Sequence, residues 1–426
     1  MTSAEPRPGD RVAVVGGGVS GLVAALALAR RYDVALFEGR DRLGGHAHTV
    51  DVALAGATYA VDTGFVVFND RTYPQLCRLL SALGVRSRPA PMTFGVRSDR
   101  TGVEFAVTTA GSLFAQRRNL LRPGYYRFLA GIARFNRLAR RARGPAADAT
   151  PLGDWLARHR LPDRTVTDYV EPLCAAIWSC PPRRVRAFPI GFLAAFLANH
   201  GMLSWSGQPQ WRTIAGGSRA YVDAIARRLG PRVRLSTPVV GLRRQPDRVL
   251  VATPAGVEAF DHAIVACHAD DALRLLADAD DREAAALGAF AYTANHVVLH
   301  TDPRVLPRAR RAWAAWNYHV PRRRDAPVSL TYAMNRLHGY AAPRELLVTV
   351  NGGGVAAPVR LGRWTVRHPA FSVQSAAVQR RHREFIARRR TSFCGAYWGY
   401  GFHEDGVSSA LRVCEAFGVS DGLVDL

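Results

Sequence analysis

The 426-residue chain contains no lysine, and all 57 of its basic residues are arginines. This absence excludes a lysine Schiff base, a lysine general base and the phosphate-binding lysine of a P-loop. The arginines outnumber 34 acidic residues and leave a formal net charge of +23. Part of that excess reflects a bias for arginine throughout the chain. The rest points to an anionic partner, which could be nucleic acid, a membrane surface or an acidic small molecule.

Cysteines and long apolar runs are also scarce. The six cysteines form no C-x-x-C pair, and a chain of this length needs no disulfide framework. No run of about 18 apolar residues could span a bilayer, and no signal peptide precedes the first expected strand, at 11–15. We therefore expect a cytoplasmic protein, with any membrane contact peripheral to the inner membrane.

A glycine-rich motif near the amino terminus carries the strongest signal. The apolar strand expected at 11–15 leads directly into G-x-G-x-x-G and then into an apolar helix. The first glycine permits a tight turn, the second lets the backbone approach a pyrophosphate, and the third lets helix and strand pack closely. The amino terminus of the helix offers N–H groups to the phosphates. The residues of this motif are Gly16, Gly18, Val19, Ser20 and Gly21.

A second expected strand, VALFE, ends at Glu38. A carboxylate about 20 residues after the glycines accepts hydrogen bonds from the ribose hydroxyls of a dinucleotide. A glutamate there disfavours a 2′-phosphate, so NADP is not the expected ligand.

The residues after Glu38 favour FAD over NAD. They form an acid-x-x-x-Arg-x-Gly-Gly string that resembles the extended fingerprint of the flavin-containing amine oxidase superfamily. The resemblance implies an FAD cofactor, with an arginine near its pyrophosphate and VDTGF, at 61–65, beside the flavin ring. His46 stands where many relatives have arginine. The implied contacts are Gly39, Arg40, Arg42, Gly44, Gly45, His46, Thr63, Gly64 and Phe65.

Three later segments resemble further FAD contacts of the superfamily. We expect a strand at 232–239 that lays Val239 against the adenine, and a strand at 261–268 that contains Ala266. Near the carboxyl terminus, FCGAYWGYGFHEDG is read as a strand, a glycine-rich turn and a helix that present backbone N–H groups to the cofactor. Ala396 replaces the acid of relatives, so Glu404 or Asp405 is a candidate for the ribityl contact. The implied contacts are Gly395, Ala396, Glu404, Asp405 and Gly406.

Five strings together resemble one narrower bacterial family of flavin oxidoreductases, often encoded beside cyclopropane-fatty-acid-synthase-like methyltransferases. The strings are GGHAHTVDV at 44–52, VDTGFVVFNDRTYP at 61–74, LFAQRRNLLRP at 113–123, AAIWSCPP at 175–182 and CGAYWGYGFHEDG at 394–406. The resemblance implies desaturation of a methylated phospholipid acyl chain, with a lipid methyltransferase as a candidate partner. The alternatives are oxidation of another apolar molecule, such as a carotenoid or porphyrin precursor, and a catalytically silent flavoprotein partner of the methyltransferase.

The distant motifs would contact one cofactor, so the cofactor domain is expected to be discontinuous. We expect an α/β fold with a Rossmann-like FAD-binding domain of the amine-oxidase, p-hydroxybenzoate-hydroxylase-like type. Its segments are 1–95, 205–290 and 385–426. The intervening segments, 96–204 and 291–384, would form an α+β substrate domain that faces the membrane.

Residues 113–143 contain nine arginines and no acid. Within them Phe128, Ile132, Phe135 and Leu138 recur at helical spacing, which predicts a basic amphipathic helix. Such a helix could place its apolar face in the headgroup region of an anionic membrane. It could also be a surface helix packed on the core. No motif resembles a nucleic-acid-binding element, so we expect no nucleic acid partner.

Two other stretches remain open to more than one interpretation. The apolar run at 187–198 could line a channel for an acyl chain or form a buried helix. The arginine-rich run at 380–390 could be a solvated face or a contact for lipid headgroups.

Desaturation by hydride transfer to flavin N5 also needs a proton acceptor. Without lysine, the candidates are His, Glu, Asp and Tyr. Glu171 is a lone acid among apolar residues, which would raise its pKa toward a useful value. His403 and Tyr397 lie in the flavin-contacting segment, where a structural hydrogen bond or aromatic core packing is the alternative role. The histidines show no metal-ligand spacing, so no metal is expected.

Overall fold

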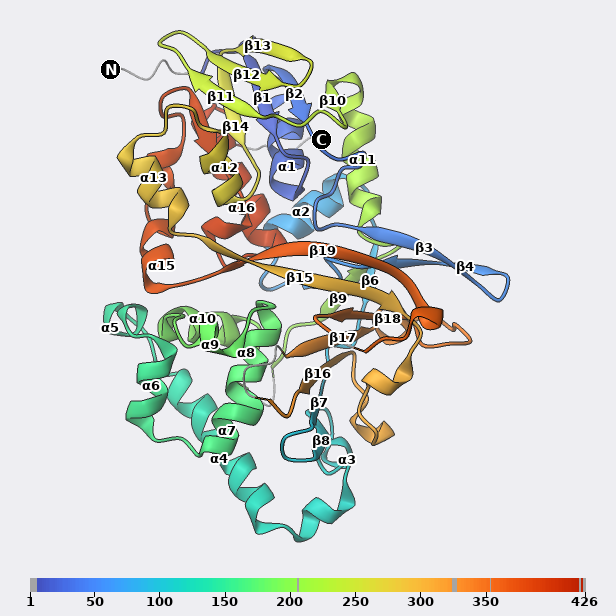
Figure 1. Ribbon diagram of the computed structural model, residues 1–426. Coiled ribbons are helices and arrows are strands. Elements are labelled where there is room, and N and C mark those ends of the chain that lie inside the picture. The colour runs from blue at the N-terminus through green and yellow to red at the C-terminus, as the bar shows by residue number, and fades with distance from the viewer. Residues whose placement is uncertain (1–5, 205–206, 324–327, 353, 421–422, 424–426) are drawn as a thin grey trace.

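A five-stranded parallel sheet forms the core of the upper part of the molecule in Figure 1, a computed structural model that describes residues 6–204, 207–323, 328–352, 354–420 and 423. The strand order is β10-β2-β1-β14-β20. Strands β1 and β2 are buried except at their first residue, and β14 and β20 are buried throughout, as is typical of parallel strands covered by helices. The edge strand β10 is half-buried. Their bounds are β1 (Arg11–Val15), β2 (Asp33–Phe37), β10 (Val233–Arg234), β14 (His262–Val265) and β20 (Thr391–Phe393).

Helices and a small sheet cover this parallel sheet. Helix α1 (Val19–Leu28) is buried along its whole length and packs against α16 (His403–Ala416) and α11 (Arg219–Leu229). The antiparallel strands β11 (Gly241–Arg244), β12 (Val249–Thr253) and β13 (Gly256–Phe260) lie at the top in Figure 1. The remaining helices of this part are α2 (Pro74–Ala82), α12 (Ala269–Leu275), α13 (Asp281–Gly288) and α15 (Val373–Gln379).

A seven-stranded sheet of order β19-β15-β18-β17-β16-β7-β8 forms the middle of the molecule. All its pairs are antiparallel except β7 with β16. In Figure 1 the long strands β15 and β19 cross beneath the part of the molecule that contains the parallel sheet. The bounds are β7 (Phe94–Ser98), β8 (Val103–Ala106), β15 (Ala291–His300), β16 (Trp316–Val320), β17 (Ser329–Ala333), β18 (Leu347–Val350) and β19 (Arg360–Ala370).

Two smaller sheets and one short helix connect these parts. They are the hairpin of β3 (Thr49–Leu54) and β4 (Ala57–Asp62), the sheet of β5 (Phe68–Asn69), β9 (Trp211–Ile214) and β6 (Ser87–Pro89), and α14 (Met334–His338).

A group of helices lies beside the seven-stranded sheet, to its left and below it in Figure 1. It contains α3 (Ala110–Leu113), α4 (Pro123–Ala139), α5 (Pro145–Ala149), α6 (Leu152–His159), α7 (Asp163–Thr165), α8 (Glu171–Ile177), α9 (Pro182–Val185) and α10 (Ile190–Asn199). The expected α/β class is therefore confirmed, whereas the numerical domain boundaries stay predictions.

The strand expected at 232–239 is much shorter than predicted, because only Val233–Arg234 pair with β2. Ser236 adopts a left-handed backbone conformation with φ of 50°, which ends the extended run. Pro238, which follows, has no N–H for a strand partner.

The apolar face of α4 packs on the protein core, so of the two interpretations the structure supports a surface helix packed on the core. Phe128, Ile132 and Phe135 are at most 3% exposed, and Phe128 makes an edge contact with Phe105. The nine arginines of 113–143 are all exposed. Among the described residues, no helix is long and apolar enough to cross a membrane.

Candidate active site

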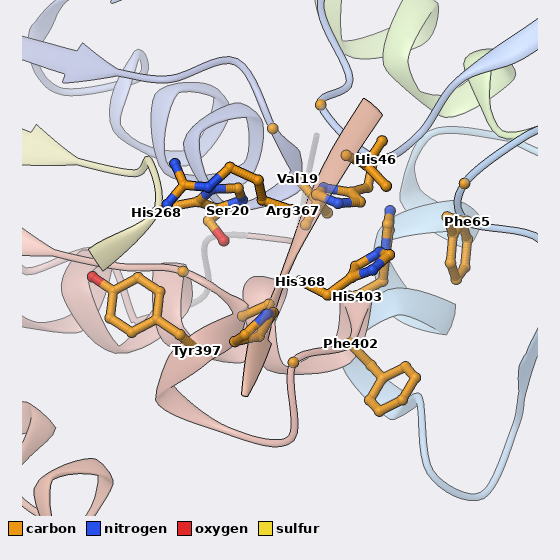
Figure 2. Close-up of a pocket in the computed structure, with 18 of the residues that line it drawn as sticks. Val19, Ser20, His46, Phe65, His268, Arg367, His368, Tyr397, Phe402 and His403 are labelled. Atoms are coloured by element: carbon orange, nitrogen blue, oxygen red, sulfur yellow. The ribbon is translucent and has the colours of Figure 1, made fainter. Parts of the chain in front are cut away.

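A cavity of about 740 Å³ lies between the parallel sheet, strands β15 and β19, and helices α8 and α10. One end is formed by the glycine-rich loop after β1 and by the end of β2. Its other end is formed by aromatic and aliphatic side chains from the group of helices beside the seven-stranded sheet and from that sheet. Figure 2 shows part of its lining.

Two glycines of the loop have different surroundings: Gly18 borders empty space that a ligand could fill, whereas Gly21 is packed closely against the backbone. A Cβ atom on Gly18 would meet no atom within 4 Å, so it would project into empty cavity space. A Cβ atom on Gly21 would lie 1.8 Å from the carbonyl oxygen of Gly16. Glu38 holds the loop, because its carboxylate accepts hydrogen bonds from the backbone N–H of Gly17 at 2.8 Å and of Arg40 at 2.9 Å.

This difference predicts opposite effects for two alanine substitutions. Gly18→Ala should leave the melting temperature of the apoprotein within about 2 °C, because its backbone is extended with φ of −75° and no atom is displaced. FAD affinity should fall at least tenfold, because the methyl group occupies the space into which a pyrophosphate must fit. Gly21→Ala should destabilise the fold by about 3 kcal/mol, because the backbone must move.

Fluorescence titration of apoprotein with FAD and thermal unfolding would test both substitutions. If Gly21→Ala folded as well as the unmodified chain and Gly18→Ala bound FAD normally, the assigned roles of the two glycines would be wrong.

Four neutral histidines surround the middle of the cavity. The ring centroid of His46 lies 5.1 Å from that of His368 and 6.0 Å from that of His268. Burial lowers the pKa of His46 to about 4, and lowers those of His268, His368 and His403 to about 3, with added repulsion from neighbouring histidines. In Figure 2 His46, His368 and His403 lie together between Ser20 on one side and Phe65 on the other.

His268 also lies close to Asp270 and Asp271, and the side chains of all three are of types that can bind metal ions. Both carboxylates already pair with arginines, since Arg367 contacts the two of them and Arg274 contacts them from the helix itself. The group therefore acts as an ion-pair cluster that joins α12 to β19.

The far end of the cavity is apolar. Trp178 and Phe196 lie 4.8 Å apart, and Phe196 stacks on Phe402 at 5.0 Å. In the described lining the carboxylates are those of Glu38, which holds the glycine loop, and Asp271, which pairs with arginines. Other lining residues at this end include Ile177, Met202, Trp211, Val297, Trp316, Tyr332, Val348 and Val350. One polar side chain, His200, also lies here, with its ring stacked on Phe196 at 3.9 Å. Burial lowers the pKa of His200 to about 4, so this imidazole is neutral.

Most of the cofactor contacts expected from the sequence line this cavity. They are Gly16, Gly18, Val19, Ser20, Glu38, Gly39, Arg40, Gly44, Gly45, His46, Thr63, Gly64, Phe65, Val239, Ala266, Gly395 and Ala396.

Three other expected contacts lie behind the lining and give it its form. Gly21 allows α1 to approach β1, and Gly406 allows α16 to approach α1, where a Cβ atom would lie 2.7 Å from Val19. The guanidinium of Arg42 donates to the carbonyl oxygens of Leu43, Gly45 and Ala47 and so holds the loop around Gly44.

Glu404 and Asp405 do not line the cavity, so their positions give no support to the ribityl contact suggested for either. Glu404 accepts hydrogen bonds from the backbone N–H groups of Gln75 and Leu76, at the start of α2. Asp405 accepts from the backbone N–H of Phe402 at 2.9 Å and caps α16. Their positions at helix termini explain why two acids occur beside the flavin-contacting segment.

Glu171 is not the isolated acid that the sequence pattern indicated. Its carboxylate lies 2.6 Å from the guanidinium of Arg186 and is absent from the described cavity lining. The structure therefore does not favour Glu171 as the proton acceptor, because its partner Arg186 arrives from a loop 15 residues away in the sequence.

His403 and Tyr397 both line the cavity. The ring of His403 stacks on Phe65 at 3.7 Å, and its Nε2 atom lies 3.2 Å from the hydroxyl of Tyr221. Burial raises the pKa of Tyr397 well above its usual value, so this phenol keeps its proton at neutral pH. The contacts of His403 match those of a structural hydrogen bonder.

The model of the flavin-containing amine oxidoreductase family matches residues 19–417 of this chain. The chain belongs to this family. The AofH protein of Mycobacterium tuberculosis strain H37Rv is 27% identical over 275 residues, which cover 60% of this chain and 56% of that protein. Canine flavin-containing amine oxidase A is 25% identical over 267 residues, covering 57% of this chain and 46% of that protein. The chain thus spans about half the length of these relatives.

Two solved structures share the fold over nearly the whole chain. Cyclohexylamine oxidase from Brevibacterium oxydans superposes with a TM-score of 0.71, 15% identity and coverage of 96% and 99% of the two chains. The fatty acid isomerase from P. acnes that produces conjugated linoleic acid superposes with a TM-score of 0.65, 14% identity and coverage of 96% and 98%.

FAD is the cofactor of this oxidoreductase family, and the residues present fit it. The glycine loop has open space at Gly18, the carboxylate of Glu38 stands at the end of β2, and α1 and α16 both begin at the cavity. Bound FAD supplies an acceptor for a hydride. The protein supplies the binding groove, the neutral imidazoles and an apolar compartment.

Several lining residues were not expected from the sequence. His268, Arg367, His368 and Phe402 all face the cavity. Phe402 lies within CGAYWGYGFHEDG, at 394–406, so its place in the lining could have been predicted from that motif. Arg367 and His368 come from the long strand β19, which no motif marks.

Proposed function

We propose that this FAD-dependent oxidoreductase removes two hydrogens from an acyl chain of a membrane phospholipid, and that a methylated acyl chain is its substrate. The single observation that carries the proposal is the chemistry of the far end of the cavity. That end offers aromatic and aliphatic side chains, and no carboxylate of the described lining is free to bind an ammonium group. An uncharged hydrocarbon chain is the ligand that such a wall favours.

Two further facts support an acyl substrate over an amine. The chain has no lysine, so it lacks the lysine that many amine oxidases place near the flavin. The P. acnes relative with the same fold is a fatty acid isomerase. In a desaturation, one carbon would lose a hydride to bound FAD and its neighbour would lose a proton to a neutral imidazole of the cavity lining. The apolar wall would hold both carbons and exclude water.

Anaerobic mixing of the FAD-loaded protein with phospholipid carrying methyl-branched acyl chains tests the proposal. We expect the flavin absorption to bleach and the recovered acyl chain to be lighter by two hydrogens. Bleaching by benzylamine but not by lipid would identify an amine oxidase, and bleaching by a carotenoid or porphyrin precursor alone would identify that substrate class. A flavin that none of these reduces would favour a silent partner of a lipid methyltransferase.

A pair of variants on α10 would test whether the acyl chain binds at the apolar end of the cavity. Phe196→Ser should slow reduction by lipid at least tenfold while FAD stays bound, because its ring faces the apolar end of the cavity. Ala195→Ser, on the exposed side of the same helix, should leave the rate unchanged. Equal rates for the two variants would contradict the assignment of this end to the substrate.

We propose that the enzyme meets the bilayer through residues 117–127, the arginine–leucine tip. Of the large apolar side chains that are exposed in the described residues, Leu120, Leu121 and Tyr126 lie within this tip, and Leu121 is 88% exposed. The Tyr126 hydroxyl donates to the carbonyl oxygen of Leu120 at 3.0 Å, so the patch is continuous. The surrounding arginines are Arg117, Arg118, Arg122 and Arg127.

Charge reversal at the tip should weaken binding to anionic vesicles. Arg117→Glu, Arg118→Glu and Arg122→Glu together should reduce binding to phosphatidylglycerol vesicles at least tenfold, since each arginine contributes about 1 kcal/mol near such a surface. The control reverses Arg137, Arg141 and Arg143, which are equally exposed but lie beyond the leucines. Equal losses in the two triple variants would mean that overall charge, and not the tip, governs binding.

A further inference from the structure

A series of hydrogen bonds fixes the ring proton of His368. This residue lies on β19 and lines the cavity. Its Nδ1 atom is 2.9 Å from Nδ2 of Asn295, which lies on the neighbouring strand β15 and is fully buried. The donor in this contact depends on how the Asn295 amide is oriented, and the surrounding backbone decides that orientation.

Two backbone groups, the N–H of His296 and the carbonyl of Thr293, determine which way the Asn295 side-chain amide is oriented. The N–H of His296 can only donate, and the amide atom of Asn351 that lies 3.1 Å from it is therefore Oδ1. Nδ2 of Asn351 then donates to Oδ1 of Asn295 at 2.6 Å. At the other end, the carbonyl oxygen of Thr293 can only accept, and it lies 3.0 Å from Nδ2 of Asn295. The contacts of both polar atoms of the Asn295 side chain therefore require the same orientation of its amide.

Asn295 must therefore donate to Nδ1 of His368, and the ring proton is on Nε2. Burial and the neighbouring His46 and His268 lower the pKa of His368 to about 3, so the ring is neutral. Among the described residues, the ring makes its only hydrogen bond through Nδ1. Its Nε2–H is thus a donor with a fixed orientation and no protein partner in that part of the chain.

The position of His368 indicates which molecule receives this donor. Its ring lies 5.1 Å from that of His46, which directly follows the two glycines of the cofactor motif. The preceding residue, Arg367, pairs with Asp270 and Asp271 just after β14, at the cofactor end. In Figure 2 His368 lies beside His46 and His403, away from Phe402 at the apolar end. His368 is therefore closer to the expected position of the flavin ring than to the apolar end proposed for the substrate.

We propose that His368 gives a neutral hydrogen bond from Nε2 to an acceptor atom of the bound flavin ring, and that Asn295 and Asn351 are positioning residues that hold its tautomer. Electrons that enter the ring place negative charge on its acceptor atoms. A fixed donor stabilises this charge and so raises the reduction potential of the flavin. The inference rests on FAD binding and not on the lipid substrate.

Nitrogen-15 NMR of histidine-labelled, FAD-loaded protein tests the tautomer directly. We expect Nε2 of His368 to carry the proton and Nδ1 to be unprotonated. Asn295→Asp should move a proton to Nδ1, because a carboxylate can only accept. His296→Gln, on the exposed side of the same strand, should leave the His368 signals unchanged. A proton found on Nδ1 in the unmodified protein would overturn the proposal.

The reduction potential of the substrate-free protein tests the contact with the flavin. His368→Leu removes the donor, and we expect at least a tenfold weaker preference for reduced over oxidised flavin, about 30 mV for a two-electron couple. His368→Gln keeps a side-chain N–H and should restore at least half of that shift. An unchanged potential in His368→Leu, or equal shifts in both variants, would overturn the contact even if the lipid reaction were confirmed.

Discussion

The folded enzyme should lose stability steeply as the pH falls from 6.5 toward 4. Ten of its 13 histidines have pKa values that burial lowers to about 3 or 4. In the unfolded chain the same histidines take up protons near pH 6.5. Between those pH values the unfolded state binds more protons, so acid favours unfolding.

The size of this effect follows from the number of protons. Each proton bound only by the unfolded state costs about 1.4 kcal/mol per pH unit. Buried carboxyls oppose the trend because the folded state binds their protons first, and burial raises the pKa of Asp62 and of Asp405 to about 6. The histidines outnumber them, so we expect a loss of at least about 5 kcal/mol between pH 6.5 and 5. Denaturant unfolding of the FAD-loaded protein at several pH values measures it.

His262 offers a matched variant for this pH dependence. It is 1% exposed, lies outside the cavity lining, and neither ring nitrogen has a partner among the described residues. His262→Leu should therefore leave the free energy of unfolding at pH 7 equal or higher. Below pH 6.5 it should make the dependence of this free energy on pH less steep, by the amount that corresponds to about one proton. His296→Leu, at an exposed position, should leave the slope unchanged. A slope that stays the same in His262→Leu would refute the explanation by buried histidines.

The cofactor half of the site could be predicted because its chemistry is local in the sequence. A turn around Gly16, a close approach at Gly18 and a carboxylate at Glu38 each require a particular residue type at a fixed spacing. The structure brings these residues to one cavity wall. The fold class follows from the same pattern, because a strand, a glycine turn and a helix define the first unit of a parallel sheet.

Features that depend on tertiary packing could not be predicted in this way. Glu171 looked isolated because its partner, Arg186, comes from a segment whose position depends on tertiary packing. The helix α4 has the periodicity of a membrane-surface helix, but periodicity does not reveal whether protein or lipid covers the apolar face. His368 was missed because its role depends on Asn295, a strand neighbour 73 residues away in the sequence.

The largest effect of a single substitution on stability should come from Glu283. Its side chain is 1% exposed, and its carboxylate contacts the buried guanidinium of Arg244 at 2.5 and 2.8 Å. Arg388 and Arg389 lie 3.4 and 3.3 Å from the same carboxylate. The arginine-rich run at 380–390 therefore contributes two of its arginines to an ion-pair network within the protein.

Glu283→Gln should destabilise the fold by about 3–5 kcal/mol, because three guanidinium groups would then surround a neutral side chain. Glu258→Gln is the matched control, since Glu258 pairs with Arg234 and Arg11 but is 42% exposed. Glu258→Gln should lower the free energy of unfolding by less than about 1 kcal/mol. Chemical denaturation at pH 7 compares the two variants. Similar losses would mean that the buried network has no special weight, and that Arg244 is stabilised by Asp278 and by Thr391 of β20 instead.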